Sequence, residues 1–322
     1  MDGAIRLTCP GGPEKLQWIA WPLEDPGPGE IRIRHEAIGV NFLDIYHRTG
    51  LYPLPAPAIP GVEGAGVVEA VGDGVEGLSA GQRVAYAGAP GAYAATRLLP
   101  AWRAVPLPDA VSAEVAAASL LRGLTAQMLL TRTCPVSPGA IVLVHAAAGG
   151  LGAILTRWIK HLGGTVIGTA GSEERAALAR AQGADHVVVG READIVAEVA
   201  RLTDGRGCDF AVDGIGGPML AKTFRCVRRF GMVVSIGQAA GPIPPVAVDE
   251  IGPVRSLTFA RPSVMAYTAE REGYPEAVRA VLAMIEAGIA AGRGPAYPLA
   301  AAAEAHADLE AGRIAGSAIL RP

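Results

Sequence analysis

The sequence has few cysteines and few aromatic residues. Its 322 residues include four cysteines, and aromatic residues make up 5% of the chain. No two cysteines stand in a C-x-x-C spacing, so neither a cysteine-based zinc cluster nor a disulfide framework is expected. We expect reduced thiols without a chemical role at all four positions: Cys9, Cys134, Cys208 and Cys226.

Clustered charge and long apolar runs are also lacking. The 28 Lys and Arg residues nearly balance 31 Asp and Glu residues, and the basic residues are scattered. A nucleic-acid partner is therefore not expected. The apolar-rich run 141–155 is shorter than the about 20 residues of a membrane span, and a Gly-Gly pair interrupts it. Since no secretory leader pattern opens the sequence either, we expect a soluble cytoplasmic protein with no membrane partner.

Hydrophobic residues and glycine, in contrast, are abundant. Hydrophobic residues make up 50% of the chain, and 42 residues are glycine. A chain of this length and composition is expected to form about two globular domains. Because glycine is so frequent, chance matches to glycine-rich motifs are common, and each motif needs support from its surroundings.

The first 115 or so residues have the pattern of a β-rich domain. Residues 30–34 alternate between apolar and charged side chains, as in a half-buried strand. Residues 61–71 are rich in glycine and β-branched residues, which indicates curved strands. Residues 81–84 and 91–96 continue this pattern. Four prolines between residues 53 and 60 predict a loop.

Beyond about residue 117 the pattern changes to alternating strands and helices. Residues 141–144 form a continuous apolar run, typical of a strand covered on both faces. Apolar residues then recur every three or four positions over 151–162, which predicts a helix. Further strands are expected at 165–169, 187–189, 210–212 and 232–235, with a helix over 173–182. This order predicts βαβ units and a parallel, doubly wound sheet.

The final residues depart from this alternation. Helices are expected near 276–286 and 299–311, followed by an apolar segment at 318–320. We expect this tail to return to the first domain. The nucleotide-binding domain would then be an insertion over 118–258, and the first domain would comprise residues 1–117 and 259–322.

The strand at 141–144 runs into a turn that resembles a dinucleotide-binding motif. In G-x-G-x-x-G terms, Gly149 and Gly152 match the second and third glycines, while Ala147 replaces the first. The second glycine lets a pyrophosphate approach the backbone, and the start of the following helix favours an anion. A plain glycine-rich turn is the alternative, but the flanking strand and helix favour the cofactor.

The next strand carries the residues that select the dinucleotide. It ends in Thr169-Ala170-Gly171-Ser172, without the acid that usually binds the ribose 2′-hydroxyl of NAD. Ser172 has the pattern of a helix N-cap. Arg175 then opposes the helix dipole in the first turn, which favours a role in binding the 2′-phosphate of NADPH. A solvated Arg175 paired with a neighbouring Glu is the alternative.

Two segments together resemble a known family. Residues 41–53, Asn-Phe-Leu-Asp-Ile-Tyr-His-Arg-Thr-Gly-Leu-Tyr-Pro, and residues 145–152, His-Ala-Ala-Ala-Gly-Gly-Leu-Gly, are similar to NADPH-dependent quinone oxidoreductases. These form the zeta-crystallin-like branch of the medium-chain dehydrogenase/reductase superfamily. Segments 123–126, 235–238 and 261–263 also resemble that branch.

The resemblance implies a GroES-like catalytic domain and a Rossmann domain, with the active site in the cleft between them, and a homodimer joined through the Rossmann domain. For the catalytic site we single out Asn41, Tyr46 and Tyr52. The residues expected to bind NADPH are Phe42, Asp44, Thr125, Gly149, Gly150, Leu151, Gly152, Gly171, Ser172, Arg175, Gly237, Gln238 and Arg313.

Several positions depart from the family pattern. Arg175 stands where lysine is common, and Gly190 replaces a tyrosine often found near the adenine ribose. Zinc-dependent relatives carry Gly-His-Glu, whereas this chain has Val62 in place of the histidine. The six histidines show no metal-ligand spacing. His145 is expected to be a hydrogen-bonded core residue, and His47 a cleft or surface residue.

These features predict a zinc-independent reductase. Without a Lewis acid to ionise an alcohol, a conjugated acceptor is the fitting substrate, because it spreads the charge of an added hydride to a distant oxygen. Tyr46 and Tyr52 are candidate hydrogen-bond donors or stacking walls; lining the cleft without a chemical role is the alternative. Reduction of quinones is the main prediction. Reduction of enones or alkenals, or a binding role with little turnover, stays open.

Overall fold

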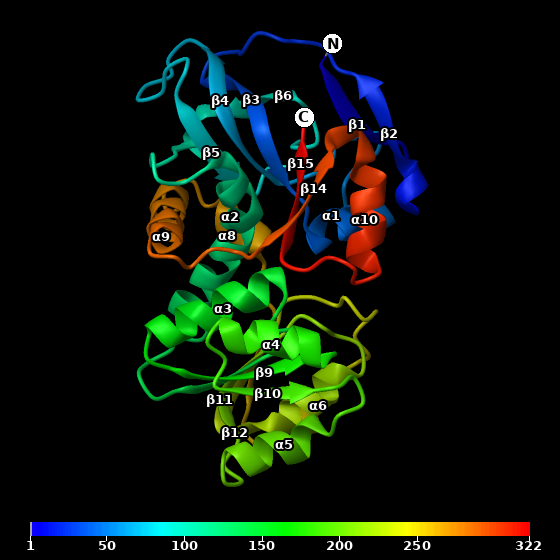
Figure 1. Cartoon of the computed structure of the whole chain (residues 1–322), viewed down its shortest axis with the longest axis vertical. Helices are drawn as coiled ribbons and strands as arrows, with labels where there is room; N and C mark the ends of the chain where they lie inside the picture. Colours follow the sequence, from blue (N-terminus) through cyan, green and yellow to red (C-terminus); the bar gives the residue numbers. More distant parts are fainter. Residues whose placement is uncertain (1) are drawn as a thin grey trace. The chain divides into compact units, whose positions relative to one another are not determined.

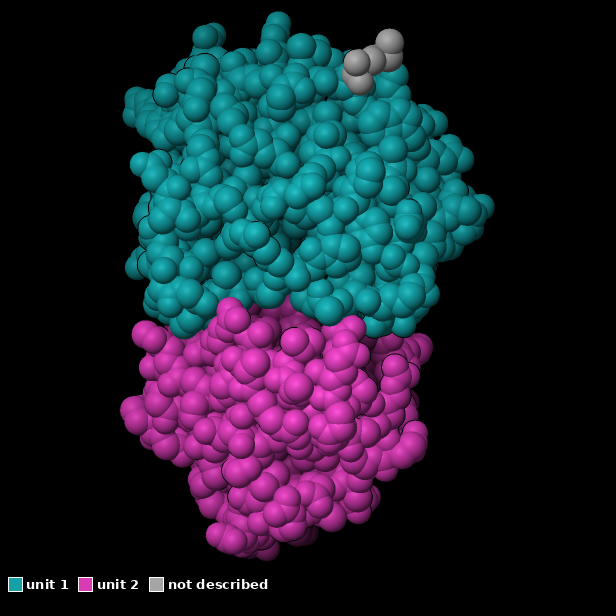
Figure 2. Space-filling view, in the orientation of Figure 1, with its two compact units in different colours: residues 1–124, 264–322 teal, residues 125–263 magenta. Residues whose placement is uncertain are grey.

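The computed structural model describes residues 2–322, which form two compact units. Unit 1 comprises Met1–Leu124 and Val264–Pro322, and unit 2 comprises Thr125–Ser263 (Figure 2). The chain passes from unit 1 to unit 2 near the end of helix α2, Ala113–Met128.

Unit 1 is built on a mostly antiparallel sheet. Its strand order is β14-β15-β3-β4-β5-β7, and β6 also pairs with β3. A separate hairpin is formed by β1, Gly3–Leu7, and β2, Leu16–Ala20. The strands of the larger sheet are β3 (Glu30–Gly39), β4 (Glu63–Val71), β5 (Arg83–Ala87), β6 (Thr96–Pro100), β7 (Val105–Pro106), β14 (Arg293–Pro298) and β15 (Ser317–Arg321).

The alternation predicted for residues 30–34 is confirmed. Ile31 and Ile33 are completely buried, while Arg32 between them is half-buried. The prediction that residues 91–96 continue the strand pattern is largely wrong. Most of this segment is irregular and β6 begins only at Thr96, because Gly91 has a φ of 109° and turns the chain.

The C-terminal segment joins the sheet of the N-terminal residues. Strand β15 pairs antiparallel with β3, with Leu320 opposite Ile38. The helices of unit 1 are α1 (Phe42–Thr49), most of α2, α8 (Val264–Ala269), α9 (Tyr274–Glu286) and α10 (Ala302–Glu310). The predicted helix near 299–311 is therefore a 3₁₀ turn, Leu299–Ala301, followed by α10.

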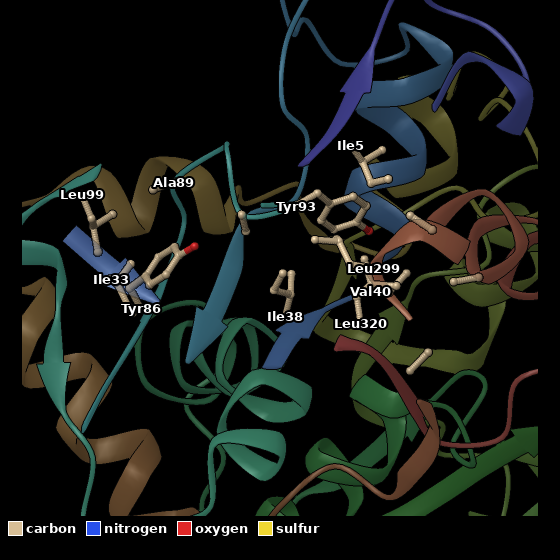
Figure 3. Packing of buried hydrophobic residues seen from close by; sticks show 14 of the residues in the cluster. Ile5, Ile33, Ile38, Val40, Tyr86, Ala89, Tyr93, Leu99, Leu299 and Leu320 are labelled. Carbon is tan, nitrogen blue, oxygen red and sulfur yellow. The ribbon is translucent and has the colours of Figure 1, made fainter. Parts of the chain in front are cut away.

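The core of unit 1 collects apolar side chains from segments far apart in the sequence. Figure 3 shows Ile5, Val40, Tyr93, Leu299 and Leu320 gathered in one region of this core. All five are 1% exposed or less. The N-terminal strand, the end of β3 and the C-terminal strand are therefore packed into one hydrophobic cluster.

Unit 2 contains a six-stranded parallel sheet in the order β10-β9-β8-β11-β12-β13. This is the strand order of a doubly wound dinucleotide-binding fold. The strands predicted from apolar runs are present, and β8 has the predicted bounds. They are β8 (Ile141–Val144), β9 (Thr165–Ala170), β10 (His186–Val189), β11 (Cys208–Asp213) and β12 (Val227–Ser235), followed by β13 (Thr258–Ala260).

Helices cover both faces of this sheet. Figure 1 shows α3, Gly150–His161, and α4, Glu173–Ala181, on one face, and α5, Ile195–Leu202, and α6, Met219–Cys226, on the other. The predicted apolar stripe of α3 is confirmed, since Ile154, Leu155 and Ile159 are buried. A short helix, α7 (Val248–Ile251), precedes β13. In the part of the chain that the structure describes, no helix is long and apolar enough to cross a membrane.

Candidate active site

One group of candidate residues lies in unit 1 at the start of α1. Asn41 is the N-cap of this helix, and its backbone N–H donates to the Asp44 carboxylate at 2.8 Å. The Asn41 side-chain amide donates to Oε1 of Glu63 at 2.7 Å. The Asp44 contact holds the backbone of Asn41 at the start of the helix, and the Glu63 contact restricts its side-chain rotamer.

Glu63 accepts the hydrogen bond that fixes the Asn41 side chain. Its carboxylate is completely buried, and it also accepts a hydrogen bond from the backbone N–H of Leu121 at 2.7 Å. The Arg122 guanidinium lies 3.6 Å from Oε1. Burial raises the pKa of Glu63, while Arg122 and the donors from Asn41 and Leu121 lower it. The neighbouring cation and the two donors offset part of the cost of burying this carboxyl group, but burial outweighs them and the pKa stays raised.

Asp44 continues the buried network away from Asn41. Its Oδ2 accepts from the Tyr93 hydroxyl at 3.2 Å, and that hydroxyl also lies 2.9 Å from Nε2 of His306. Burial raises the pKa of Asp44 to about 7, while the hydrogen bond from Asn41 opposes the shift. Because the Asp44 side chain is completely buried, it positions Asn41 and has no accessible surface for a ligand.

An aromatic group lies along α1 and just beyond it. The ring centroids of Phe42 and Tyr46 are 6.3 Å apart, and those of Tyr46 and Tyr52 are 5.2 Å apart in an edge-to-face arrangement. The backbone N–H of Tyr52 also donates to the carbonyl of Tyr46 at 3.1 Å. Tyr52 and Phe42 are half-buried, whereas Tyr46 is 9% exposed. The two tyrosines predicted to be catalytic are therefore direct neighbours.

Two further predictions concern the chemistry of unit 1. Val62 is completely buried and carries no atom that could bind a metal. The carboxylate of the adjoining Glu63 accepts hydrogen bonds from Asn41 and Leu121. Among residues 2–322, no group of three or more His, Cys, Asp or Glu is arranged to hold a metal ion. The prediction that His47 is a surface residue is wrong, whereas its location beside a cleft stays a prediction. His47 is 6% exposed, because it lies on the buried side of α1.

A separate group of candidate residues forms the turn between β8 and α3 in unit 2. Gly149 is the N-cap of α3 and has no side chain to satisfy the first N–H groups of the helix. Gly149, Gly150 and Leu151 are half-buried. A Cβ on Gly152 would lie only 2.3 Å from the Ala146 carbonyl oxygen, so this glycine permits close helix–strand packing. An open helix N-terminus suits a pyrophosphate.

The end of β9 carries the residues predicted to select the dinucleotide. The prediction that Ser172 caps α4 is confirmed, since its Oγ accepts from the backbone N–H of Arg175 at 3.3 Å. Gly171 and Ser172 are exposed, and Arg175 is half-buried. The hydroxyl of Ser172 keeps its own hydrogen for donation to a ligand. The residues in this turn fit a phosphate, because a helix N-terminus, a hydroxyl and a guanidinium occur together.

The other predicted residues lie in both units. In unit 2, Gln238 follows β12, and its Oε1 accepts from Arg261 at 3.5 Å, while Gly237 beside it is buried. Thr125 is half-buried near the end of α2. In unit 1, Arg313 forms an exposed ion pair with Asp308 at 2.5 Å.

His145 is a hydrogen-bonded core residue, as predicted. Its ring nitrogens lie 2.8 Å from the Thr223 hydroxyl and 3.2 Å from the Thr169 hydroxyl. Thr223 in turn donates to Asp213 at 2.9 Å. Burial lowers the pKa of His145, which favours its neutral form.

Comparison with known proteins identifies the family. Residues 150–286 match the family described as zinc-binding dehydrogenase, and residues 27–109 match the alcohol dehydrogenase GroES-like domain. A quinone oxidoreductase of Pseudomonas aeruginosa is 40% identical over 325 residues, covering 100% of both chains. The chain belongs to the quinone oxidoreductase branch of the medium-chain dehydrogenase/reductase superfamily.

Two other relatives carry names that describe different substrates. The crystal structure of Escherichia coli quinone oxidoreductase complexed with NADPH matches with a TM-score of 0.95 at 38% identity, covering 99% of this chain and 100% of that one. A 2-haloacrylate reductase from Burkholderia sp. is 39% identical and covers 97% of this chain and 96% of its own length. The family thus includes proteins named for two kinds of conjugated substrate.

Proposed function

We propose that this protein is a zinc-independent reductase that transfers hydride from NADPH to quinones. The observation that carries this proposal is the full-length likeness to the NADPH-bound quinone oxidoreductase of E. coli. The described site adds chemical support, because unit 2 offers an open helix N-terminus and unit 1 offers a buried polar network beside an aromatic group. We assign catalysis to residues 1–117 and 259–322, and nucleotide binding to residues 118–258.

NADPH, when bound, supplies the hydride, and the chain has to bind the cofactor and orient the acceptor. We propose that Gly149, Gly150, Leu151 and Gly152 hold the pyrophosphate, and that Gly171, Ser172 and Arg175 hold the adenosine 2′-phosphate. The remaining proposed cofactor contacts are Phe42, Thr125, Gly237, Gln238 and Arg313. Asp44 acts through Asn41, whose backbone it fixes.

The acceptor is proposed to bind beside Asn41, Tyr46 and Tyr52. A planar conjugated ring can pack against the aromatic side chains, and a tyrosine hydroxyl can donate to the oxygen on which charge develops. The carbon that receives the hydride is distant from that oxygen in a quinone. Hydrogen bonds therefore stabilise the charge where it accumulates, and simple saturated ketones gain less from the same site.

A substrate panel tests the proposal. NADPH oxidation is measured with quinones, enones, 2-haloacrylate, saturated ketones and, in reverse, saturated secondary alcohols with NADP⁺. We expect turnover on quinones and little on saturated ketones or alcohols. Turnover on enones or 2-haloacrylate alone would favour the second candidate, a double-bond reductase, which the Burkholderia relative supports. Cofactor binding without turnover on any acceptor would favour a binding role.

We also propose that the protein is a homodimer joined through unit 2. Strand β13 lies at the edge of the six-stranded sheet. Phe230, within β12, and Val254, in the segment between β12 and β13, are 77% and 75% exposed. An exposed strand edge with large apolar residues nearby suits pairing across a two-fold axis. Light scattering at micromolar concentration is expected to give the mass of a dimer, and a monomer mass would contradict this proposal.

A further inference from the structure

A second arginine lies beside the proposed adenosine phosphate site. Strands β9 and β10 are parallel neighbours, with Val189 opposite Ala170. The backbone N–H of Gly190 donates to the carbonyl of Ala170 at 2.9 Å. The carboxyl ends of the two strands are therefore held side by side, and Arg191 follows immediately after Gly190.

The side chain of Arg191 lies across Gly171. A Cβ added to Gly171 would be 3.6 Å from Nε of Arg191 and 3.7 Å from its Cγ. Both distances correspond to ordinary van der Waals contact. Gly171 directly precedes the N-cap Ser172, so the guanidinium of Arg191 reaches the same turn that carries Ser172 and Arg175.

Arg191 has no partner of its own. It is exposed, and no hydrogen bond or ion pair joins it to any residue in the range 2–322. The nearby acid Asp194 is engaged elsewhere, since its carboxylate caps α5 by accepting from two backbone N–H groups. Two other arginines of the unit differ in this respect: Arg180 pairs with Glu173 at 3.3 Å, and Arg201 pairs with Glu198 at 2.9 Å.

We propose that Arg191 binds the 2′-phosphate of NADPH together with Arg175 and determines the preference for NADPH over NADH. This inference rests on the proposed function. A phosphate monoester carries a charge of about −1.5 to −2 at pH 7 and offers three acceptor oxygens, so one guanidinium does not neutralise it. Arginines from both sides of Gly171 supply two cations. The 2′-hydroxyl of NADH carries no charge and gains little from either.

The absence of a side chain at Gly190 leaves room for Arg191 to lie beside Gly171. Gly190 has a φ of 110°, a backbone conformation that other residues rarely adopt. A Cβ there would meet nothing closer than Ala193, at 3.9 Å. The turn after β10 is therefore open beside the strand end, and it directs the chain so that the residue after Gly190 covers Gly171.

Binding of nucleotide fragments tests this role without catalysis. Calorimetry on the full chain compares 2′,5′-ADP with 5′-AMP, which lacks the 2′-phosphate, in the wild type, R191A, R175A and R201A. We expect R191A to lower the affinity for 2′,5′-ADP by about tenfold or more and to change the affinity for 5′-AMP little. A hydrogen bond to a charged group contributes at least about 1.5 kcal/mol, and about 1.4 kcal/mol corresponds to a factor of ten in affinity. The matched control R201A removes an arginine on α5 and should bind both ligands like the wild type.

The outcomes separate this inference from the proposed function. If the wild type binds 2′,5′-ADP no more tightly than 5′-AMP, the NADPH preference itself fails, and the role of Arg191 fails with it. If the wild type discriminates but R191A discriminates equally well, only the role of Arg191 is overturned. The role of Arg191 is also overturned if R191A lowers the affinity for both ligands equally, since that pattern indicates a structural residue. R191K, which keeps the charge, should recover part of the discrimination.

Discussion

Gly149 and Gly152, which match two glycines of the dinucleotide-binding motif, should behave differently when each is replaced by alanine. At Gly152, a Cβ would lie 2.3 Å from the Ala146 carbonyl oxygen and 2.8 Å from the Ala147 Cα. Both are backbone atoms of the turn after β8, so α3 or this turn must shift. At Gly149, the nearest atom would be the Ala146 carbonyl oxygen at 3.1 Å, and the backbone is extended with a φ of −76°. Only a small adjustment is needed there.

The expected magnitudes follow from these distances. Overpacking a well-filled interior costs about 1–3 kcal/mol, so G152A should lower the free energy of unfolding by an amount in that range. G149A should change it by less than about 0.5 kcal/mol, as substitutions without a clash usually do. Its new methyl group stands at the start of α3, where the pyrophosphate is proposed to approach the backbone. G149A should therefore lower the affinities for NADPH and NADH by similar factors.

Urea unfolding and cofactor titration measure the two effects separately. Trp158, one of the four tryptophans of the chain, is buried in α3, so the change of fluorescence on unfolding includes the loss of packing around that helix. Unfolding of G152A at the same urea concentration as the wild type would contradict the predicted clash at Gly152. An unchanged affinity of G149A for both cofactors would contradict the proposed pyrophosphate contact, because the turn would then not approach the pyrophosphate.

Three further predictions follow from the polar contacts. Burial raises the pKa of Asp44 from 3.8 to about 7, so the folded state holds this proton more tightly than the unfolded chain. Its contribution to stability is present at pH below 3.8 and is lost, at about 1.4 kcal/mol per pH unit, as the pH rises to about 7. D44N should remove this part of the pH dependence in urea unfolding at pH 4 to 8; an unchanged slope would show that Asp44 ionises normally. S172A should lower the free energy of unfolding by about 1 kcal/mol through loss of the α4 cap, and it should lower the affinity for NADPH more than that for NADH. An equal loss of affinity for both cofactors would show that the Ser172 hydroxyl does not bind the 2′-phosphate. Y52F keeps the ring, and it should lower kcat on a quinone by about 10²-fold if the hydroxyl donates to developing charge. An unchanged kcat would leave Tyr52 as a stacking wall.

The sequence was most informative about unit 2. Its parallel strands are buried on both faces, so they stand out as continuous apolar runs, and β8 was predicted with its exact bounds. Unit 1 was less predictable because its strands pair across long sequence separations. Residues 91–95 share the composition of a strand, but the turn at Gly91 prevents one.

The candidate site was predictable only where it depends on local pattern. Ser172 was recognised as an N-cap because capping is a local property. The contact of Asn41 with Glu63 joins residues 22 positions apart, and Tyr93 and His306 are 213 apart, so no local pattern indicates that these groups meet. Arg191 was missed for the same reason, since its closeness to Gly171 follows from the pairing of β9 with β10.

The most direct test of the account is the rate of NADPH oxidation by the purified, chelator-treated protein with a quinone as the only acceptor, together with elemental analysis for zinc. We expect turnover with NADPH that exceeds turnover with NADH, no loss of activity to the chelator, and no stoichiometric zinc. Stoichiometric zinc with activity lost to the chelator, or efficient oxidation of saturated alcohols without any reduction of quinones or enones, would contradict this expectation.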